Sequence, residues 1–287
     1  MSESPNRRLR GLIGRRKAVL LPGAANALTA RVIEDLGFEA VYVTGAGVTN
    51  TFLGMPDIGL LTVTELADHV AAMRDAVALP LIVDADTGFG NAVNVGRAVK
   101  TLERAGASAI QLEDQDFPKR CGHFSGKSVI PTAEMVQKIR AAADARIDPD
   151  LIIVARTDAI AVNGFDDAME RANAYIEAGA DMTFVEAPRT PEQIAAIPKL
   201  AVPQLLNIVA GGLTPMLSRA ELEKMGYALV LYANAALQAA VAGMQAVLEH
   251  LKAQGSLDDI SDKVAGFAER QRLVNKPHFD ALEKKYS

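Results

Sequence analysis

The side chains best suited to chemistry in this sequence are acids that follow short apolar runs. Four of them stand at the ends of two neighbouring runs: Asp84, Asp86, Glu113 and Asp114. Because the side chains of a strand alternate between its two sides, Asp84 and Asp86 are expected to point the same way. Converging carboxylates repel each other without a cation, and hard oxygen ligands with room for water suit Mg²⁺ or Mn²⁺. The acids, with Arg156 beside them, therefore predict a divalent-metal site; the alternative is that each acid is a solvated strand end or a helix cap.

The only cysteine of the chain is the second candidate for chemistry. Cys121 lies in the polar stretch "EDQDFPKRCGHFSGK" (113–127), next to Lys119, Arg120 and His123. Neighbouring cations lower the pKa of a thiol, so Cys121 could serve as a general acid or base that hands a proton to a carbanion. The glycines of the stretch would let it close over a substrate. The alternatives are an unreactive surface thiol and a metal ligand, although no second cysteine exists to share a metal.

Eight short, apolar and β-branched runs would position these residues, with helical stretches between them. Strands are predicted over residues 18–24, 40–45, 79–86, 108–114, 151–158, 182–187, 203–209 and 228–234. Nearly continuous apolar strands that alternate with helices indicate a parallel sheet covered on both faces. Eight units favour an α/β fold of the (β/α)8 TIM-barrel type over a doubly wound sheet. In such a barrel the carboxyl ends of the strands share one mouth, where the acids would meet.

Composition limits the class of protein. The chain has 287 residues, 49% of them hydrophobic, and a net charge of −5, which disfavours binding to nucleic acid or an anionic membrane. One cysteine cannot form an internal disulfide, which suits a reducing cytoplasm. No apolar run approaches the roughly 18 residues of a membrane span, and the N-terminus lacks the apolar segment of a signal peptide. We expect one cytoplasmic barrel domain over residues 1–287 that acts on a small molecule, with a helical extension from about residue 240.

Four motifs occur in order at the predicted strand ends: "VDADTGFGN", "LEDQ", "KRCGH" and "ARTDA". Together they resemble the isocitrate lyase/phosphoenolpyruvate mutase superfamily over roughly residues 10–285. Within it, "KRCGH" resembles the loop of the carbon–carbon lyases, such as the 2-methylisocitrate and 2,3-dimethylmalate lyases. The resemblance implies a (β/α)8 barrel whose last helix is exchanged with a neighbouring copy, usually in a homotetramer.

The same resemblance implies roles for individual residues. It implies Mg²⁺ contacted by Asp86, with Asp84, Glu113 and Asp114 acting largely through water. It implies substrate contacts from Thr44, Gly45, Ala46, Gly122, His123, Arg156, Glu186 and Asn207. Tyr42 and Asp57 match residues near the substrate hydroxyl, and Cys121 matches the acid/base of the lyases.

The chemistry implied by the resemblance is the Mg²⁺-dependent cleavage of a carbon–carbon bond. The substrate would be a 2-hydroxy di- or tricarboxylate of the 2-methylisocitrate or 2,3-dimethylmalate type, and the products an α-keto acid such as pyruvate and a carboxylate. The metal and Arg156 would hold the α-oxygen and a carboxylate, and a base, through Tyr42 or Asp57, would remove the hydroxyl proton. Cys121 would then protonate the carbanion.

Two positions keep the substrate open. Gln238 stands where 2-methylisocitrate lyases tend to carry arginine, and Ala233 stands where oxaloacetate hydrolases carry serine. The alternatives are a phosphoenolpyruvate phosphonomutase or phosphonopyruvate hydrolase that acts on a P–C bond, an oxaloacetate hydrolase or decarboxylase, and a non-catalytic barrel that binds small acids.

Overall fold

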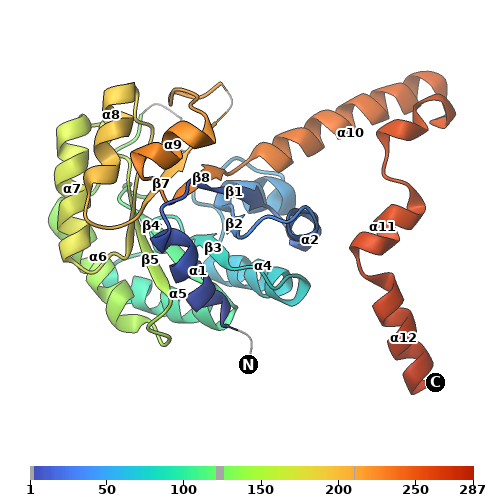
Figure 1. Ribbon diagram of the computed structural model, residues 1–287, viewed down its shortest axis with the longest axis horizontal. Coiled ribbons are helices and arrows are strands. Elements are labelled where there is room, and N and C mark those ends of the chain that lie inside the picture. Colours follow the sequence, from blue (N-terminus) through green and yellow to red (C-terminus); the bar gives the residue numbers. More distant parts are fainter. Residues whose placement is uncertain (1–2, 121–125, 210) are drawn as a thin grey trace.

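Eight short strands of the computed structural model close into a parallel barrel in chain order (Figure 1). They are β1 (Val19–Ala24), β2 (Val41–Val43), β3 (Leu81–Asp84), β4 (Ala109–Glu113), β5 (Ile152–Thr157), β6 (Met182–Val185), β7 (Gln204–Asn207) and β8 (Leu229–Tyr232). The structure describes residues 3–120, 126–209 and 211–287. The predicted (β/α)8 barrel is confirmed, and the doubly wound sheet is excluded because β1 pairs with β8.

Each predicted strand is present, but all were predicted slightly too long. The run 40–45 shows why, because β2 ends at Val43 and Thr44 already caps the next helix: its Oγ1 accepts a hydrogen bond from the backbone N–H of Gly47 at 3.2 Å. Polar residues that follow an apolar run thus belong to the loops at the carboxyl ends of the strands, where catalytic groups of such barrels lie.

Helices surround the barrel, and one of them closes its amino-terminal end. The barrel helices are α1 (Pro5–Gly14), α2 (Ala27–Asp35), α3 (Gly45–Val48), α4 (Val63–Ala76), α5 (Ala92–Arg104), α6 (Thr132–Ala145), α7 (Phe165–Glu177), α8 (Pro191–Ala196) and α9 (Arg219–Met225). Leu9, Leu12 and Ile13 of α1 are buried in the apolar cluster inside the barrel. Short 3₁₀ or π turns cover Thr49–Leu53, Ala159–Ala161, Ile197–Lys199 and Asp258–Lys263.

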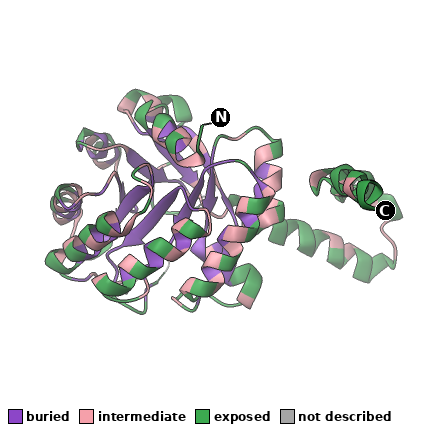
Figure 2. Cartoon of the chain, turned by 90° about the horizontal axis from the view of Figure 1, so that it is seen from below, coloured by how far each residue is buried: buried purple, intermediate pink, exposed green. Residues whose placement is uncertain are grey.

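The strands are buried on both faces, as Figure 2 shows. One apolar cluster fills the barrel interior, and two others lie between the strands and the surrounding helices. In β4, Ala109 belongs to the interior cluster, whereas Ile110 and Leu112 belong to a cluster against the helices. The alternation of side chains therefore places Glu113 inside the barrel and Asp114 outside it.

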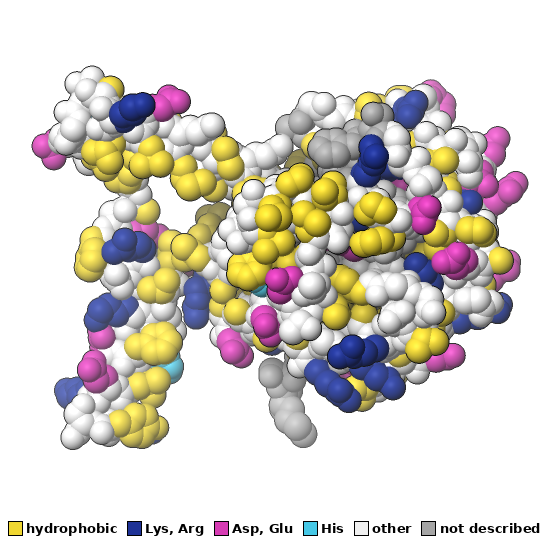
Figure 3. All heavy atoms as spheres, turned by 180° about the vertical axis from the view of Figure 1, so that it is seen from behind, with side chains coloured by type: hydrophobic (Ala, Val, Ile, Leu, Met, Phe, Trp, Pro, Cys, Tyr) yellow, Lys and Arg dark blue, Asp and Glu magenta, His cyan; other side chains and the backbone are white. Residues whose placement is uncertain are grey.

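A helical arm leaves the barrel after β8 (Figure 1) and contacts it again where Arg272 pairs with Asp35 of α2 at 2.7 Å. It consists of α10 (Ala235–Gln254), α11 (Phe267–Leu273) and α12 (Lys276–Tyr286), and none of these helices contains a buried residue. Apolar side chains are visible along the arm in Figure 3. No helix in the described part of the chain, α10 included, is long and apolar enough to cross a membrane.

Candidate active site

A cavity of about 230 Å³ lies at the carboxyl ends of the strands. Nine of the residues singled out in the sequence line it: Tyr42, Thr44, Ala46, Asp57, Asp84, Glu113, Arg156, Glu186 and Asn207. They come from six different strands or the loops that follow them, so the closure of the barrel brings them together. Cys121, Gly122 and His123 lie outside the described residues.

The acids of the third strand end converge beside Gly45. Oδ1 of Asp84 accepts hydrogen bonds from Nε2 of Gln111 at 3.1 Å and from the backbone N–H of Asp86 at 3.3 Å. A Cβ atom on residue 45 would lie 3.3 Å from both Oδ2 of Asp84 and Oδ1 of Asp86. Glycine at this position therefore leaves the space in which the two carboxylates meet. The prediction that they point the same way agrees with this geometry.

Lys119 supplies the positive charge nearest to these acids. Its Nζ lies 2.9 Å from Oδ1 of Asp86 and also pairs with Asp57, and the side chain is only 3% exposed. Burial alone would lower the pKa of Lys119, but the surrounding carboxylates, led by Asp86 and Glu113, hold that pKa well above its usual value. The sequence placed Lys119 near Cys121; the structure shows that it also pairs with Asp57 and Asp86.

Burial disfavours the charged form of two of the acids, Asp86 and Glu113. Burial raises the pKa of Asp86 to about 6, although Lys119 opposes the shift. Burial also holds the pKa of Glu113 well above its usual range, against the effect of Arg156. Oε1 of Glu113 is buried and has no hydrogen-bond partner among the described residues. A further cation would stabilise both carboxylates in their charged form.

The donor set fits a hard divalent cation that keeps part of its water. Asp84, Asp86 and Glu113 present carboxylate oxygens of the kind that Mg²⁺ and Mn²⁺ bind. Across residues 3–120, 126–209 and 211–287, however, no three acidic, histidine or cysteine side chains are arranged to hold a metal ion by themselves. Water and substrate oxygens would have to complete the coordination shell.

Asp114 is not part of this group, contrary to the prediction that it belongs to the metal site. Its carboxylate lies on the outer side of β4, where it accepts hydrogen bonds from the hydroxyls of Thr157 at 2.7 Å and Tyr175 at 2.8 Å. It also accepts the backbone N–H of Asp158 at 2.9 Å and lies 3.3 Å from Nη1 of Arg171. The alternation along β4 separates it from Glu113, so its contacts hold the barrel wall together behind the cavity.

Arg156 is held in one orientation by two acids and an aromatic ring. Its Nε and Nη2 donate to the two oxygens of Asp158 at 2.8 and 3.1 Å, and its Nη1 lies 3.3 Å from Oε2 of Glu113. Glu113 and Arg156 are directly paired in the register of β4 and β5, which explains that contact. The guanidinium also lies 5.1 Å from the centre of the Phe184 ring. Arg156 is thus preorganised to bind a carboxylate.

Asp158 was seen in the sequence only as a strand end, yet it anchors two cations. Besides Arg156, it accepts a hydrogen bond from Nζ of Lys127 at 2.7 Å, and both side chains of this second pair are almost fully buried. Burial would raise the pKa of Asp158, but Arg156 and Lys127 outweigh it and lower the pKa to about 2. Pairings between residues this far apart in the chain leave no local sequence signal.

Asp158→Ala should therefore destabilise the fold strongly. Removing one member of a buried, hydrogen-bonded charge group costs about 3–5 kcal/mol, because the remaining charges stay buried without a counter-charge. We expect a loss of this size in the free energy of unfolding, measured by urea titration at fixed protein concentration. The matched control is Asp280→Ala, which removes the exposed pair with Lys276 and should cost less than about 1 kcal/mol. Equal losses in the two variants would contradict the role given to Asp158.

Tyr42 and Asp57 both reach the cavity, and their surroundings differ. The hydroxyl of Tyr42 donates to Oε1 of Gln111 at 2.9 Å. Burial holds the pKa of Tyr42 well above its usual value, and Asp84 adds to the shift, so the phenol stays protonated. Asp57 is a carboxylate paired with Lys119. Of the two residues, Asp57 is better suited to accept a proton.

The lining of the cavity also includes neutral and apolar groups. Nδ2 of Asn207 donates to Oε1 of Glu186 at 3.4 Å, and Oδ1 of Asn207 is buried with no hydrogen-bond partner in the described part of the chain. The remaining lining includes Val209, Leu231, Ala233, Asn234 and Gln238, none of which is charged. The cavity therefore combines charged side chains with apolar ones that suit small alkyl groups.

The segment that leads to Cys121 is fastened to the edge of the cavity. The side chain of Gln115 accepts the backbone N–H of Arg120 at 2.9 Å and donates to the carbonyl oxygen of Arg120 at 2.8 Å. Arg120 lines the cavity. The residue that precedes Cys121 in the chain is therefore part of the lining of the candidate active site.

The sequence was compared with protein families and with known proteins, and related chains were found in both comparisons. The phosphoenolpyruvate phosphomutase family matches residues 9–252. The chain is 44% identical over 282 residues to 2,3-dimethylmalate lyase of Eubacterium barkeri, a match that covers 98% of this chain and 97% of the relative. It is 42% identical over 286 residues to 2-methylisocitrate lyase of Aeropyrum pernix, covering 99% and 92% of the two chains.

Solved structures show the same architecture. A 2,3-dimethylmalate lyase superposes with a TM-score of 0.93 at 32% identity, covering 100% of this chain and 97% of that one. An oxaloacetate acetylhydrolase bound to 3,3-difluorooxalacetate gives 0.93 at 33% identity, with 99% and 97% covered. A phosphonopyruvate hydrolase in complex with oxalate and Mg²⁺ gives 0.89 at 32% identity, with 99% of each chain covered.

Proposed function

Because the chain belongs to the phosphoenolpyruvate phosphomutase family, within the isocitrate lyase/phosphoenolpyruvate mutase superfamily, we propose that it is a carbon–carbon lyase dependent on a divalent cation. Its substrate is a 2-hydroxy dicarboxylate that carries small alkyl groups, of the 2,3-dimethylmalate type, and its products are an α-keto acid and a carboxylate. The observation that carries the proposal is the lining of the cavity, in which Arg156 and the acids occur together with uncharged, partly apolar side chains. The enzyme works in a reducing cytoplasm, in keeping with its single cysteine.

Asp84, Asp86 and Glu113 are the residues that would hold the cation. A related phosphonopyruvate hydrolase is known in complex with Mg²⁺, which supports this ion as the first choice. When bound, a divalent cation supplies positive charge that stabilises negative charge developing on substrate oxygens. Lys119 and Arg156, which line the same cavity, add fixed positive charge.

The side chains of the cavity account for binding and for both proton transfers. Arg156, oriented by Asp158, binds a substrate carboxylate through its guanidinium. The Asp57 carboxylate accepts the proton of the substrate hydroxyl. This leaves negative charge on the substrate oxygen, which the ammonium of Lys119, the partner of Asp57, stabilises. The hydroxyl oxygen becomes the carbonyl oxygen of the α-keto acid as the carbon–carbon bond breaks. The electron pair of that bond stays on the leaving carbon, which then takes the proton of the Cys121 thiol.

The uncharged side chains of the cavity favour a dicarboxylate over a tricarboxylate. Lys119, Arg120 and Arg156 are the cations of the lining, and a third carboxylate placed instead beside Val209, Leu231, Ala233 and Gln238 would be a buried charge without a cationic partner, which is costly. Methyl groups of a dimethylmalate would instead contact apolar side chains there. The relative with 44% identity, a 2,3-dimethylmalate lyase, supports this choice.

The test is a panel of substrates assayed by the appearance of pyruvate or glyoxylate, and of oxalate in the case of oxaloacetate. The panel contains 2,3-dimethylmalate, 2-methylisocitrate, isocitrate, citramalate, oxaloacetate and phosphonopyruvate, each with Mg²⁺. We expect the highest kcat/KM with 2,3-dimethylmalate or citramalate. Preferred cleavage of 2-methylisocitrate would contradict the assignment of a dicarboxylate, and turnover of phosphonopyruvate alone would replace the carbon–carbon lyase with a P–C hydrolase.

We also propose that the helical arm packs against another copy of the chain, in a homotetramer with exchanged helices. Val241, Met244, Leu248 and Leu251 recur at intervals of three or four along α10 and are 41, 54, 60 and 38% exposed. Residues at that spacing share one face of a helix, and an apolar face of this length is usually buried. The barrel does not cover this face, so a second copy is the partner proposed.

Removing α11 and α12 should dissociate the assembly. A chain ended after Gln254 lacks Phe267 and Phe279, which are 71 and 58% exposed in the arm and would lose their contacts with the partner. Sedimentation velocity at micromolar concentration is expected to show a tetramer for the full chain and smaller species or insoluble protein for the shortened one. Full-length Glu249→Gln, which changes an exposed polar side chain of α10, is the control. A stable full-length monomer would contradict the proposal.

A further inference from the structure

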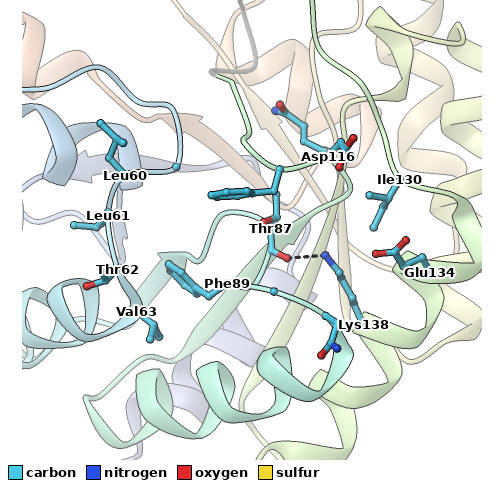
Figure 4. Close-up of a pocket in the computed structure, with 15 residues that line it drawn as sticks. Leu60, Leu61, Thr62, Val63, Thr87, Phe89, Asp116, Ile130, Glu134 and Lys138 are labelled. Atoms are coloured by element: carbon cyan, nitrogen blue, oxygen red, sulfur yellow. Dashed lines mark hydrogen bonds between the residues drawn. The ribbon is translucent and has the colours of Figure 1, made fainter.

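A second and larger cavity, of about 570 Å³, lies beside the candidate active site (Figure 4). Three segments enclose it: residues 59–63 before and at the start of α4, residues 87–91 after β3, and residues 115–117 with Ile130 and the first turns of α6. Gln115, one of the residues that line it, also holds the active-site segment through Arg120. We propose that this cavity binds a neutral small molecule with a ring-sized apolar body and one carbonyl or hydroxyl oxygen.

The apolar body of the ligand follows from the lining. Leu60, Leu61 and Phe89 face Ile130 across the space in Figure 4, and Phe117 also lines it. Cavities of roughly 300–1,000 Å³ with mainly apolar walls and a few converging polar groups are typical of small-molecule sites. The volume here lies within that range and exceeds the 230 Å³ of the candidate active site.

The oxygen acceptor follows from Lys138. This lysine lines the cavity, is 5% exposed, and donates one hydrogen bond, from Nζ to the carbonyl oxygen of Thr87 at 3.1 Å. Within the described ranges it forms no ion pair of 4.0 Å or less and no other hydrogen bond. An ammonium has three N–H bonds, and a buried donor without an acceptor is costly. A ligand oxygen would meet this need.

The neutrality of the ligand follows from the charges around Lys138. Glu134 and Asp116 also line the cavity, and both are exposed at its rim. Two carboxylates against one ammonium make the cavity negative as a whole, so an anion would be repelled on entry. The dicarboxylates proposed for the active site are therefore excluded from this second cavity.

An occupant would contact both segments that carry the acids of the candidate active site. Thr87 directly follows Asp86 in the chain, and residues 115–117 follow the strand end that carries Glu113. Binding of a ligand to the second cavity does not require the lyase reaction proposed for the active site. An experiment can therefore contradict one proposal and leave the other standing.

The binding proposal is tested by ligand-detected fluorine NMR on the full-length protein in the presence of Mg²⁺. Three matched probes are titrated: para-fluoroacetophenone, which is neutral with an acceptor oxygen; para-fluorotoluene, which lacks the oxygen; and para-fluorobenzoate, which is charged. We expect saturable binding of the acetophenone, about tenfold weaker binding of the toluene because a hydrogen bond to a charged group is lost, and the weakest binding of the benzoate.

Two variants locate the probe. Leu60→Trp places a larger side chain at the mouth of the cavity and should abolish binding of para-fluoroacetophenone, whereas Val162→Trp, at a similarly exposed apolar position outside the cavity, should leave it unchanged. Lys138→Met keeps the length of the side chain but should reduce the affinity for the acetophenone to that for the toluene. The proposal is overturned if no probe saturates, if the benzoate binds best, or if neither variant changes binding of the acetophenone. A partner segment that fills the cavity in the assembled protein would give the first of these results.

Discussion

Asp86→Ala is expected to lose divalent-cation binding and to reduce turnover by about 10³-fold or more, because a metal ion contributes several kcal/mol to such transition states. Asp86 is buried, meets Asp84 beside Gly45, and carries a pKa that burial raises to about 6. Its carboxylate therefore gains more than an exposed one from a nearby cation.

Metal binding is measured apart from activity, by titration calorimetry with Mn²⁺ and Mg²⁺. EDTA should abolish turnover of the unaltered enzyme, and either ion should restore it. Asp75→Ala, on the exposed face of α4, is the control for a lost acid and should bind metal normally. Because the substitution at Asp86 also removes a partner of Lys119, circular dichroism should verify that the variant is folded. Full activity in a verified metal-free preparation of the unaltered enzyme would refute the metal site.

Cys121→Ser is expected to lower kcat by about 10²–10⁴-fold, the usual contribution of a general acid or base. Serine keeps the size of the side chain, but its hydroxyl is far too weak an acid to protonate a carbanion at the rate of a thiol. Cys121 follows Arg120, which lines the cavity and is held there by Gln115. The role of the thiol itself comes from the sequence and the proposed reaction.

The distinguishing measurement is binding without turnover. Calorimetry with oxalate, an inert dicarboxylate, should give nearly the same affinity in Cys121→Ser and in the unaltered enzyme, and Mg²⁺ affinity should also persist. Weak binding of both would show that the substitution damages the site and does not simply remove a proton donor. If Cys121→Ser instead keeps most of its turnover on every lyase substrate, the thiol is not the acid/base, and a P–C enzyme becomes the better explanation.

Much of the fold was predictable because strand patterns are local. Eight apolar runs of the right length, each followed by polar residues, are enough to predict a (β/α)8 barrel, and the eight strands of the structure confirm it. The period of two along a strand also predicted that Asp84 and Asp86 share a side. The strand ends were less predictable, since Thr44 caps a helix and does not extend β2.

The same period could not decide between Glu113 and Asp114. Neighbouring residues in a strand face opposite sides, so only one of the two could reach the cavity, and both appeared in the predicted metal site. The structure decides the matter through packing: Ala109 of β4 lies in the barrel interior, and Asp114 is committed to Thr157 and Tyr175 outside it.

The sequence by itself determined the barrel, the strand-end acids and the chemistry that such acids can perform. Only the tertiary structure decided how their charges are balanced. Lys119 pairs with Asp57, 62 residues away, and Lys127 pairs with Asp158, 31 residues away. Glu113 meets Arg156 because β4 and β5 are in register. Propensity and alternation act over a few neighbouring residues, whereas these pairs depend on the closure of the barrel, which brings distant loops to one mouth.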